Sequence, residues 1–429
     1  MGRFERRWRA RSRRHWAILI VCLAIVVGGI WIAVGERAIP AVVVLSAPAR
    51  KAAPQPLSAP GDIAVATAVR SAPSASRDVD RVEVCGLGLV EAGPDRTVDP
   101  AMLARMPAVA AARRRLVDSL ASSGDEFARA ASLWLRMIDP SGVTLAADFR
   151  EQLAQAAMTT RDPRVYALAF KTCRAAPEGG GCVLLSARRW AQLDIDNGEP
   201  WLFVANEAMA RKDREQADEA LFRLGAAARV EDRYFAVAGL LAGRAGEKDT
   251  GLLAAHELAL ESLGGMAAQA TPPLQSVLTA CRGPSLVDAN RRQRCDAVAS
   301  ALAERSDTLL YASIGAAMGR RLGWSPARTD AIASLSSAST QSLFTREADP
   351  LQWSCARVAR MLERFARQGA VGEVRFAREW IEASGSTVEA YAAREAERRR
   401  RRADDLARSA NTSVLAAALA ASEASFSER

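Results

Sequence analysis

Residues 351–365 read Leu-Gln-Trp-Ser-Cys-Ala-Arg-Val-Ala-Arg-Met-Leu-Glu-Arg-Phe, and this stretch shows the pattern that decides the fold class. Its apolar positions recur at steps of four and three residues: Leu351, Cys355, Val358, Leu362 and Phe365. Charged residues occupy the other positions: Arg357, Arg360, Glu363, Arg364 and, just beyond, Arg367. Apolar residues at this spacing line one side of an α-helix, so the stretch predicts an amphipathic helix with one buried stripe.

The same pattern continues on both sides of this helix. Two further stripes are Leu310, Ile314, Ala317 and Leu322, and Val371, Val374, Ala377 and Ile381. From about residue 99 onward, breakers recur at short intervals: 139–142, 177–181, 197–198, 264–265, 272–273, 283–284 and 349–350. No convincing run of alternating strands occurs. Many helices of 10–20 residues joined by short turns favour an all-α fold of antiparallel helix pairs stacked as a solenoid.

One segment of the helical region carries a family resemblance. Residues 189–201 read Arg-Trp-Ala-Gln-Leu-Asp-Ile-Asp-Asn-Gly-Glu-Pro-Trp, and the match continues through Trp201, Ala205, Ala217 and Leu221. Over about residues 187–225 the chain resembles a junction of tetratricopeptide repeats, with Ala205 and Ala217 as the small residues where two helices touch. The resemblance implies an irregular α-solenoid whose concave face binds peptides or proteins.

The first 35 residues predict a membrane anchor. Seven arginines lie within residues 1–15, and residues 16–35 form an uncharged run long enough to cross a bilayer. Positive charge near a span stays in the cytoplasm, so we expect the rest of the chain on the far side. Small residues at four-residue spacing, Ala24 with Gly28 and Gly29 with Ala33, would allow a homodimer through this helix. A cleaved signal peptide is the alternative, although its apolar region is usually shorter.

The region beyond the span divides into three parts by composition. Residues 36–98 are rich in proline and alanine and predict an extended linker. Residues 99–385 are the helical domain. Residues 386–429 form an arginine-rich helix and tail, in which the apolar stripe disappears and five arginines follow one another: Arg398, Arg399, Arg400, Arg401 and Arg402. This basic run is interpreted either as a solvated helix face or as a patch for anionic lipid, cell-wall polymer or an acidic protein.

Net charge and composition restrict the partners and the compartment. The chain carries a formal charge of +9, of which residues 1–15 contribute +6, so the remainder is nearly balanced. This balance argues against nucleic acid as a main partner. The strong preference for arginine and alanine indicates a GC-rich bacterial genome. The combined prediction is a single-pass protein of the bacterial inner membrane, with its N-terminus cytoplasmic and its bulk in the periplasm.

Six cysteines follow the predicted span. An even number in an oxidising compartment suggests disulfides, and the spacing favours Cys173–Cys182, Cys281–Cys295 and a long-range Cys85–Cys355 bridge. A loop of about 15 residues closed by such a bridge contributes up to about 3 kcal/mol of stability. Buried free cysteines are the alternative. None of the spacings is typical of a zinc site.

No residue pattern identifies a reaction or a cofactor. Of the two histidines, His15 precedes the span, and His256 begins a His-Glu pair whose second metal-ligand position is Leu260. The 194–198 stretch resembles the start of a calcium loop, but its glycine is one position early. Nucleophile elbows and phosphate-binding loops are not found. Glu207 and Glu219 would face across a repeat but are ordinary helix-surface residues, and the ectodomain tryptophans are interpreted mainly as core fillers.

Taken with the anchor, these features predict a non-enzymatic, membrane-anchored periplasmic scaffold that binds an envelope protein or peptide. The alternative is an enzyme or ligand-binding module that acts on cell-wall glycan through carboxylates that no motif reveals.

Overall fold

The computed structural model describes residues 81–92, 98, 100–138, 146–175, 180–245, 249–269, 274–343, 353–398, 400–401, 404–405 and 408. The chain divides into two compact units, Met1–Arg77 and Asp78–Arg429, and every described residue belongs to the second. Fifteen α-helices, α2 to α16, and two short β-strands are assigned within these ranges, and residues 388–398 are helical as well, which confirms the all-α prediction. The predicted anchor, residues 16–35, lies outside the described residues.

Among the residues described, none of the helices combines the length and apolar character that crossing a membrane requires.

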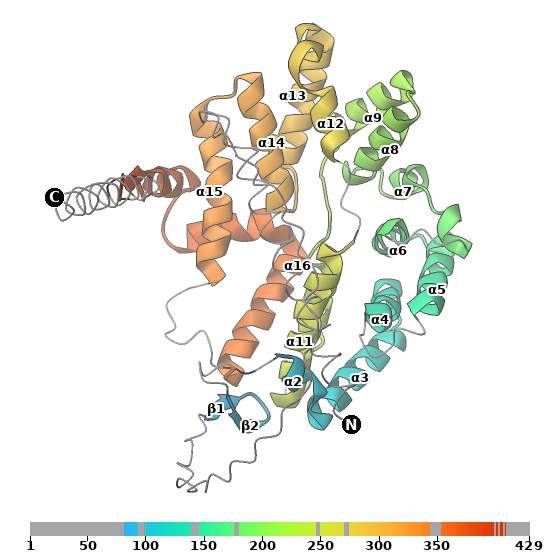
Figure 1. Ribbon diagram of the computed structural model, residues 1–429, viewed down its shortest axis with the longest axis vertical. Coiled ribbons are helices and arrows are strands. Elements are labelled where there is room, and N and C mark those ends of the chain that lie inside the picture. The colour runs from blue at the N-terminus through green and yellow to red at the C-terminus, as the bar shows by residue number, and fades with distance from the viewer. Residues whose placement is uncertain are drawn as a thin grey trace, which may run out of the picture. The chain divides into compact units, whose positions relative to one another are not determined.

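The helices follow one another with short connections (Figure 1). The first group comprises α2 (Pro100–Arg105), α3 (Pro107–Ala121), α4 (Glu126–Ile138), α5 (Ala146–Thr159), α6 (Pro163–Ala175), α7 (Ala187–Leu193), α8 (Glu199–Ala210) and α9 (Arg214–Ala226). The second comprises α10 (Ala236–Gly243), α11 (Asp249–Ala267), α12 (Leu274–Ala280), α13 (Ala289–Glu304), α14 (Leu309–Leu322), α15 (Pro326–Leu343) and α16 (Cys355–Ala383). Two 3₁₀ turns, η2 (Gly180–Leu184) and η3 (Gly283–Val287), lie between helices.

The α8–α9 hairpin forms where the sequence resembles a repeat. Asp213 begins α9 by accepting a hydrogen bond from Gln216 N at 3.0 Å, as a helix N-cap does. Ala205, Ala217 and Leu221 are buried between the helices, and Trp201 is partly buried. Burial of these small and apolar residues lets the two helices pack closely.

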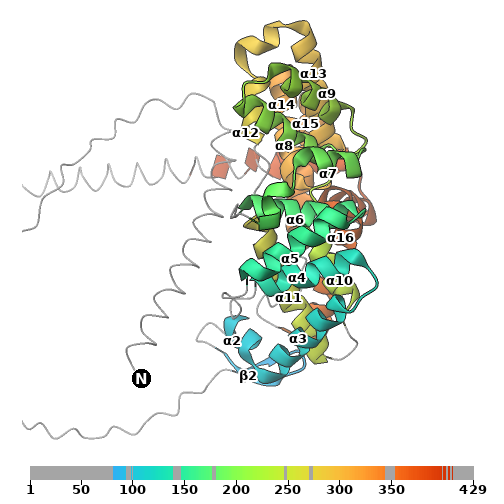
Figure 2. The ribbon, with the colours of Figure 1, turned by 90° about the vertical axis from the view of Figure 1, so that its right-hand side faces the viewer.

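The packing order follows the chain in the first group and then departs from it. Each helix from α3 to α9 contacts the next, and Figure 2 shows them stacked one above another. Helix α9 then packs on α13, and α13 to α16 follow in sequence. Helix α10 packs instead on α11 and α16, and α11 reaches back to α3. A simple row of nearest neighbours therefore describes only part of the arrangement.

The contact between α10 and α16 depends on two glycines. A Cβ atom on Gly369 would lie 2.7 Å from Gly239 Cα, which is too close for any side chain. Three residues later α16 is interrupted at Gly372, whose φ of 79° is accessible to glycine with little strain. The two stripes predicted from the sequence, 351–365 and 371–381, thus correspond to the two helical parts of α16 that meet at Gly372, and Val358, Leu362, Phe365, Val374, Ala377 and Ile381 are buried in them.

The stripe predicted in α14 differs from the observed one. Leu310, Ile314 and Ala317 are only partly buried, whereas the fully buried face is Tyr311, Ala312, Gly315, Ala316, Met318, Gly319 and Leu322. Helix α14 packs on both α13 and α15, so its small residues are covered as well as its large ones. Burial on two sides hides the one-sided pattern that sequence reading assumes.

A β-hairpin occupies part of the predicted linker. Strands β1 (Arg81–Val84) and β2 (Gly88–Glu91) pair antiparallel, although no strand was expected from the sequence. Val82, Val84 and Val90 pack against α2, α3 and α11 in a small core of their own. The folded unit thus begins before residue 99, because apolar strand residues find a helical surface that lies far away in sequence.

The six cysteines form the three pairs that the sequence favours. Cys173–Cys182 joins α6 to η2, and Cys281–Cys295 joins the end of α12 to α13. Cys85–Cys355 ties the β-hairpin to the start of α16 across a separation of 270 residues. The last bridge fixes the edge of the domain to its longest helix.

Candidate functional site

The connection between α9 and α10 is the centre of a network that we call the polar junction, formed by residues 194–199, 229–235, 305–309 and 372–373 with Lys171 and Tyr311. Its backbone pairs on two sides. Gly198 N donates to Arg229 O at 2.8 Å, and Val230 N donates to Arg305 O at 2.8 Å. The connection therefore links the turn before α8 to the turn before α14 in the manner of a short strand.

Asn197 holds the turn before α8 through both ends of its amide. Its Oδ1 accepts from Glu199 N at 3.0 Å and Glu231 N at 2.8 Å. Its Nδ2 donates to Asp194 Oδ2 at 3.0 Å and to Glu231 O at 3.2 Å. A fully buried side chain with four hydrogen bonds fixes this turn against the 229–235 segment.

The Asp194 carboxylate binds two arginines. Arg229 contacts Asp194 Oδ1, and Arg233 Nη2 donates to Asp194 Oδ2 at 2.9 Å. Arg233 also pairs with Glu231 at 3.1 Å. Asp194 is the first carboxylate of the stretch that resembles the start of a calcium loop, and it thus binds guanidinium groups. The residues of this stretch contribute to the contact between helices.

Lys171 from α6 enters this network without access to solvent. Its Nζ lies 2.7 Å from Glu199 Oε1 and also contacts the Asp232 carboxylate, and Lys171 is 3% exposed. Burial opposes the charge on Lys171, but Asp232 and Glu199 outweigh it and raise the pKa of the ammonium. Burial raises the pKa of Glu199 well above its usual value, against the lowering effect of Lys171. Tyr311 donates to Glu199 at 3.1 Å.

Asp307 and Glu373 link the turn before α14 to the kink of α16. Asp307 accepts from Asp232 N and Arg233 N at 2.9 and 2.8 Å, while its backbone oxygen accepts from Glu373 N at 2.7 Å. Glu373 Oε2 in turn accepts from Leu309 N at 3.2 Å. Burial raises the pKa of each carboxyl to about 7, with the nearby Asp232 charge adding to the effect.

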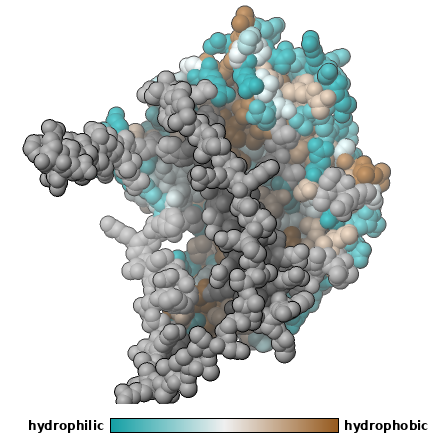
Figure 3. Space-filling model, in the orientation of Figure 1, coloured by the Kyte–Doolittle hydropathy of each residue, from teal (hydrophilic) through white to brown (hydrophobic). Residues whose placement is uncertain are grey.

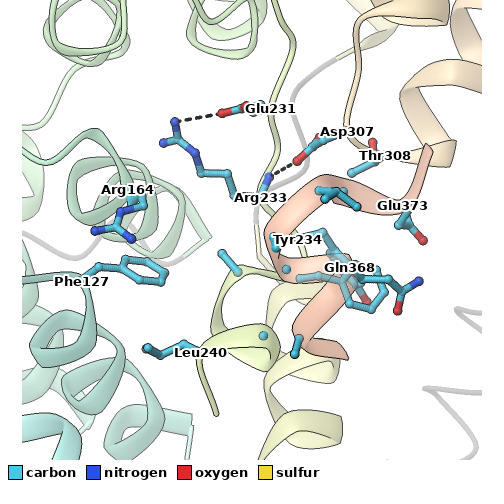
Figure 4. Close-up of a pocket in the computed structure, with 18 residues that line it drawn as sticks. Phe127, Arg164, Glu231, Arg233, Tyr234, Leu240, Asp307, Thr308, Gln368 and Glu373 are labelled. Carbon is cyan, nitrogen blue, oxygen red and sulfur yellow. Dashed lines mark hydrogen bonds and ion pairs between the residues drawn. The ribbon is translucent and has the colours of Figure 1, made fainter. Parts of the chain in front are cut away.

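A cleft of about 410 Å³ opens beside these two carboxyls, and we call it the junction cleft (Figure 4). Its lining comes from α4, α6, the 231–236 segment, α10, the turn before α14 and α16: Phe127, Arg164, Glu231, 233–236, 239–240, 307–308, 366 and 368–373. Phe127, Arg164 and Leu240 face the kinked part of α16 across the cleft. The side chains of Gln368 and Glu373 project from α16 on the side away from Phe127, Arg164 and Leu240.

The cleft wall combines charged and apolar surface. Arg164 lies over the Phe127 ring, with Cζ 4.9 Å from the centroid, and pairs with Asp162 at 2.7 Å and Asp125 at 3.2 Å. Gly239 and Gly369, at which α10 and α16 pack directly against each other, also line the cleft. The arrangement offers hydrogen-bond acceptors, two occupied arginines and an apolar floor to a ligand of side-chain or short-peptide size.

The residues singled out from the sequence lie elsewhere. Trp201, Ala205, Ala217 and Leu221 pack in the α8–α9 hairpin, and none of them or of the six cysteines lines the junction cleft. His256 is buried at the contact between α11 and α16, with its ring 5.3 Å from that of Trp353 and 6.2 Å from that of Phe365. These residues stabilise the domain and do not line the cleft.

The surface glutamates and the tryptophans have structural contacts. Glu207 pairs with Arg174 at 3.2 Å, and Glu219 with Arg223 at 2.7 Å. Trp134 and Trp190 are completely buried core fillers, as their helical spacing predicts. On the face drawn in Figure 3, apolar residues are gathered in small patches among hydrophilic ones.

The arginine-rich helix is largely paired along its own surface. Arg398 contacts Glu395 at 2.6 Å, and Arg400 and Arg401 contact Glu397 at 3.0 and 2.9 Å. The side chains of Arg399 and Arg402 lie outside the described residues. Tyr391, seven residues before this run, packs against Trp380 of α16. Ion pairs one turn apart are typical of a solvated helix, which favours that interpretation of the basic run.

Sequence reading missed Lys171, Asp232, Asp307 and Glu373. Lys171 alone carried a signal, because it is one of few lysines and follows the apolar run 165–170 in a predicted helix. A charge in such a run indicates a buried partner. The acids stand in turns and at a kink, where aspartate and glutamate are common, so nothing in the linear order marked them.

Comparison of the chain with protein-family models, with curated proteins and with solved structures finds no match. The site is therefore interpreted from its geometry and chemistry alone.

Proposed function

We propose that this protein is a membrane-anchored periplasmic interaction module that binds a segment of an envelope protein in the junction cleft. The anchor rests on the arginines of residues 1–15 and the apolar run 16–35. The compartment rests on three cysteine pairs at bonding distance, which an oxidising environment would keep as disulfides. Stacked antiparallel helices, as in a tetratricopeptide-like solenoid, provide a rigid frame for such a site.

The single observation that carries the binding function is the cleft itself. Its lining is assembled from six separate segments, and it is large enough for a side chain with its backbone. Asp307 and Glu373, the two carboxyls whose pKa values are raised, already accept hydrogen bonds from backbone N–H groups. This favours a structural and binding role for them over proton transfer. A binding module needs fixed acceptors, and the polar junction holds these groups in place.

Crosslinking in living cells tests this proposal. A photo-crosslinking amino acid replaces Leu240, which lines the cleft, in the full-length protein. The control replaces Val287, which is 88% exposed and outside the cleft lining. We expect a discrete adduct with one envelope protein from position 240 and no such adduct from 287. Equal adducts from both positions, or none from either, would contradict cleft-mediated binding.

The compartment has its own test. Mass spectrometry of the full-length protein, isolated from membranes without reductant, should find Cys85–Cys355, Cys173–Cys182 and Cys281–Cys295 bridged. Six free thiols would argue against a periplasmic location.

A hydrolase acting on cell-wall glycan is the second candidate, because Asp307 and Glu373 both have pKa values raised to about 7 beside one cleft. Glycoside hydrolysis uses a carboxyl pair of which one member stays protonated near neutral pH. Digestion of purified peptidoglycan by the native protein, lost in both Asp307→Asn and Glu373→Gln, would establish this activity. Equal product with the native protein and with both variants would exclude it.

A further inference from the structure

We propose that the turn after α6, residues 180–189, contacts the surface of a bilayer that contains anionic phospholipid. This inference rests on the proposed membrane anchor and concerns a surface outside the lining of the junction cleft. We call residues 180–189 the rim turn, which comprises η2, the connection that follows it and the start of α7. Its exposed side chains, its fixed conformation and its charge support the inference.

The rim turn exposes two consecutive aliphatic side chains. Val183 is 70% exposed and Leu184 is 66% exposed, although aliphatic residues of this size are usually buried. In Figure 1 the turn lies at the right-hand edge of the domain, between α6 and α7, and Figure 3 shows apolar surface at this edge. A single exposed aliphatic residue is ordinary, but two together at an edge form an apolar tip that a bilayer can accommodate.

Bonds on both sides of this tip hold the rim turn in its conformation. Before the two aliphatic residues, the Cys173–Cys182 disulfide fixes the turn to α6. After them, Ser186 N donates to Tyr166 Oη of the same helix at 3.0 Å. Because the turn is attached to α6 at two points, it cannot fold back to bury the two side chains. Their exposure is therefore a fixed property of this surface.

The charge of the rim turn suits anionic headgroups. Arg188 and Arg189 are both exposed, and neither forms an ion pair with a residue that the structure describes. The turn contains no acidic residue of its own, and Glu151 of α5 beside it accepts from Gly181 N at 2.8 Å. Guanidinium groups bind phosphate oxygens, and apolar side chains next to arginines are typical of surfaces that lie in a bilayer interface.

Ile195 shows why exposure alone is not sufficient. It is 75% exposed in the turn between α7 and α8, but it stands between Asp194 and Asp196. The Asp196 side chain is 65% exposed, and an anionic bilayer would repel its carboxylate. An aliphatic tip next to unpaired arginines therefore distinguishes the rim turn from an equally exposed position nearby in sequence.

The predicted tether makes a weak contact sufficient. The predicted anchor is followed by a predicted linker, and the folded unit begins with β1 at Arg81. A flexible chain of about 45 residues spans on the order of 40 Å, so the domain would stay within reach of the bilayer. Tethering raises the local concentration of the two surfaces to about the millimolar range. Two aliphatic side chains and two arginines would then be enough to populate the contact.

Fluorescence quenching in proteoliposomes tests the inference with the full-length protein. An environment-sensitive fluorescent amino acid replaces Leu184, and brominated phospholipid quenches it only where it enters the bilayer. One set of vesicles contains phosphatidylcholine alone, and the other contains equal parts of phosphatidylcholine and phosphatidylglycerol. We expect quenching at position 184 to be at least about threefold stronger in the anionic vesicles, because each arginine near an anionic surface adds to the attraction. The same amino acid at Ile195 should show little quenching in either set.

A pair of arginine substitutions tests the role of charge. Arg188→Gln with Arg189→Gln should reduce quenching at position 184 in anionic vesicles to the level found with phosphatidylcholine alone. The matched control is Arg320→Gln with Arg321→Gln, which removes the same charge from two consecutive exposed arginines of α14. This control should leave the quenching unchanged. Circular dichroism of each variant checks that it folds.

The outcomes separate this inference from the proposed anchor. Absence of quenching at position 184 in both sets of vesicles, with the protein still resisting alkaline extraction, would overturn the lipid contact and leave the anchor standing. Equal quenching in both sets, unaffected by loss of Arg188 and Arg189, would overturn the recognition of anionic lipid. Release of the protein by alkaline extraction would contradict the anchor itself, and the tethered contact with it.

Discussion

The α8–α9 hairpin and the polar junction are adjacent but are stabilised in opposite ways. The hairpin packs small and apolar residues of two consecutive helices across a three-residue turn. The junction joins charged groups far apart in sequence, such as Lys171 with Asp232, 61 positions away, and Tyr311 with Glu199, 112 positions away. Local apolar packing is recoverable from sequence, whereas a buried charge is explained only by partners that folding brings to it.

The two regions also differ in how strongly the loss of one contact lowers their stability. A hairpin tolerates loss of one surface contact, because its stability is spread over many apolar atoms. A buried ion network does not, because each missing partner leaves a charge without solvent or counter-ion. The following predictions use this difference, beginning with the largest expected effect.

Replacement of one lysine by methionine in the polar junction and of another in the α8–α9 hairpin compares the two regions directly. Lys171→Met leaves Glu199 and Asp232 without their cation, and we expect it to lower the free energy of unfolding by about 3–5 kcal/mol. Lys212→Met, at the exposed turn of the hairpin, should change it by less than about 0.5 kcal/mol. Urea unfolding followed by circular dichroism measures both. Adding Glu199→Gln to Lys171→Met should restore part of the loss, and a double variant no better than the single one would contradict the pairing.

The next prediction concerns the glycine crossing that positions the cleft. Gly369→Val would place a side chain within 2.7 Å of the α10 backbone, and we expect a loss of about 1–3 kcal/mol as the helices separate. Gly264→Ala is the matched control, because a Cβ there meets nothing within 4 Å and should be neutral or stabilising by up to about 1 kcal/mol. Thermal unfolding compares the two. Equal midpoints would show that the crossing is looser than the structure indicates.

Stability should depend on pH through the junction and not through the hairpin. Glu373 has a pKa of about 7 in the folded protein, whereas an unfolded glutamate has one near about 4.3. Between these values the folded chain keeps a proton that the unfolded chain has released, so the free energy of unfolding falls as pH rises towards 7.

The comparison of the native chain with Glu373→Gln isolates this contribution. From pH 5 to pH 8 the native chain should lose about 1–2 kcal/mol relative to the variant. Denaturant unfolding at both pH values measures the difference. A constant difference would mean that the pKa of Glu373 is not raised.

The smallest effect is expected in the hairpin. Asp213→Ala removes the N-cap of α9 and should cost about 1 kcal/mol. Glu219→Ala, which removes an exposed ion pair with Arg223 on the same helix, should cost about 0.3–0.5 kcal/mol. Chemical denaturation of the two variants provides the test. An Asp213→Ala cost as large as that of Lys171→Met would remove the contrast between the regions.

Particular residues show which features of the fold the sequence predicted and why other features were missed. The 351–365 periodicity predicted the helix that begins at Cys355 and buries Val358, Leu362 and Phe365, and spacing favoured the three cysteine pairs that the structure forms. The stripe of α14 was displaced because that helix is covered on two sides. The β-hairpin was missed because its valines pack on helices far away in sequence. The membrane span and the linker up to residue 80 lie outside the described residues and stay predictions.

The sequence by itself determined the elements whose causes are local. Apolar spacing, N-cap residues and breakers act within one or two helical turns, so the helices and the α8–α9 hairpin can be read in linear order. Only the tertiary structure decided that α9 packs on α13, that α10 crosses α16 at two glycines, and that Lys171 meets Glu199 and Asp232 in the polar junction. A charge is stabilised by whichever partners surround it in space, and the linear order of a single chain does not specify which residues those are.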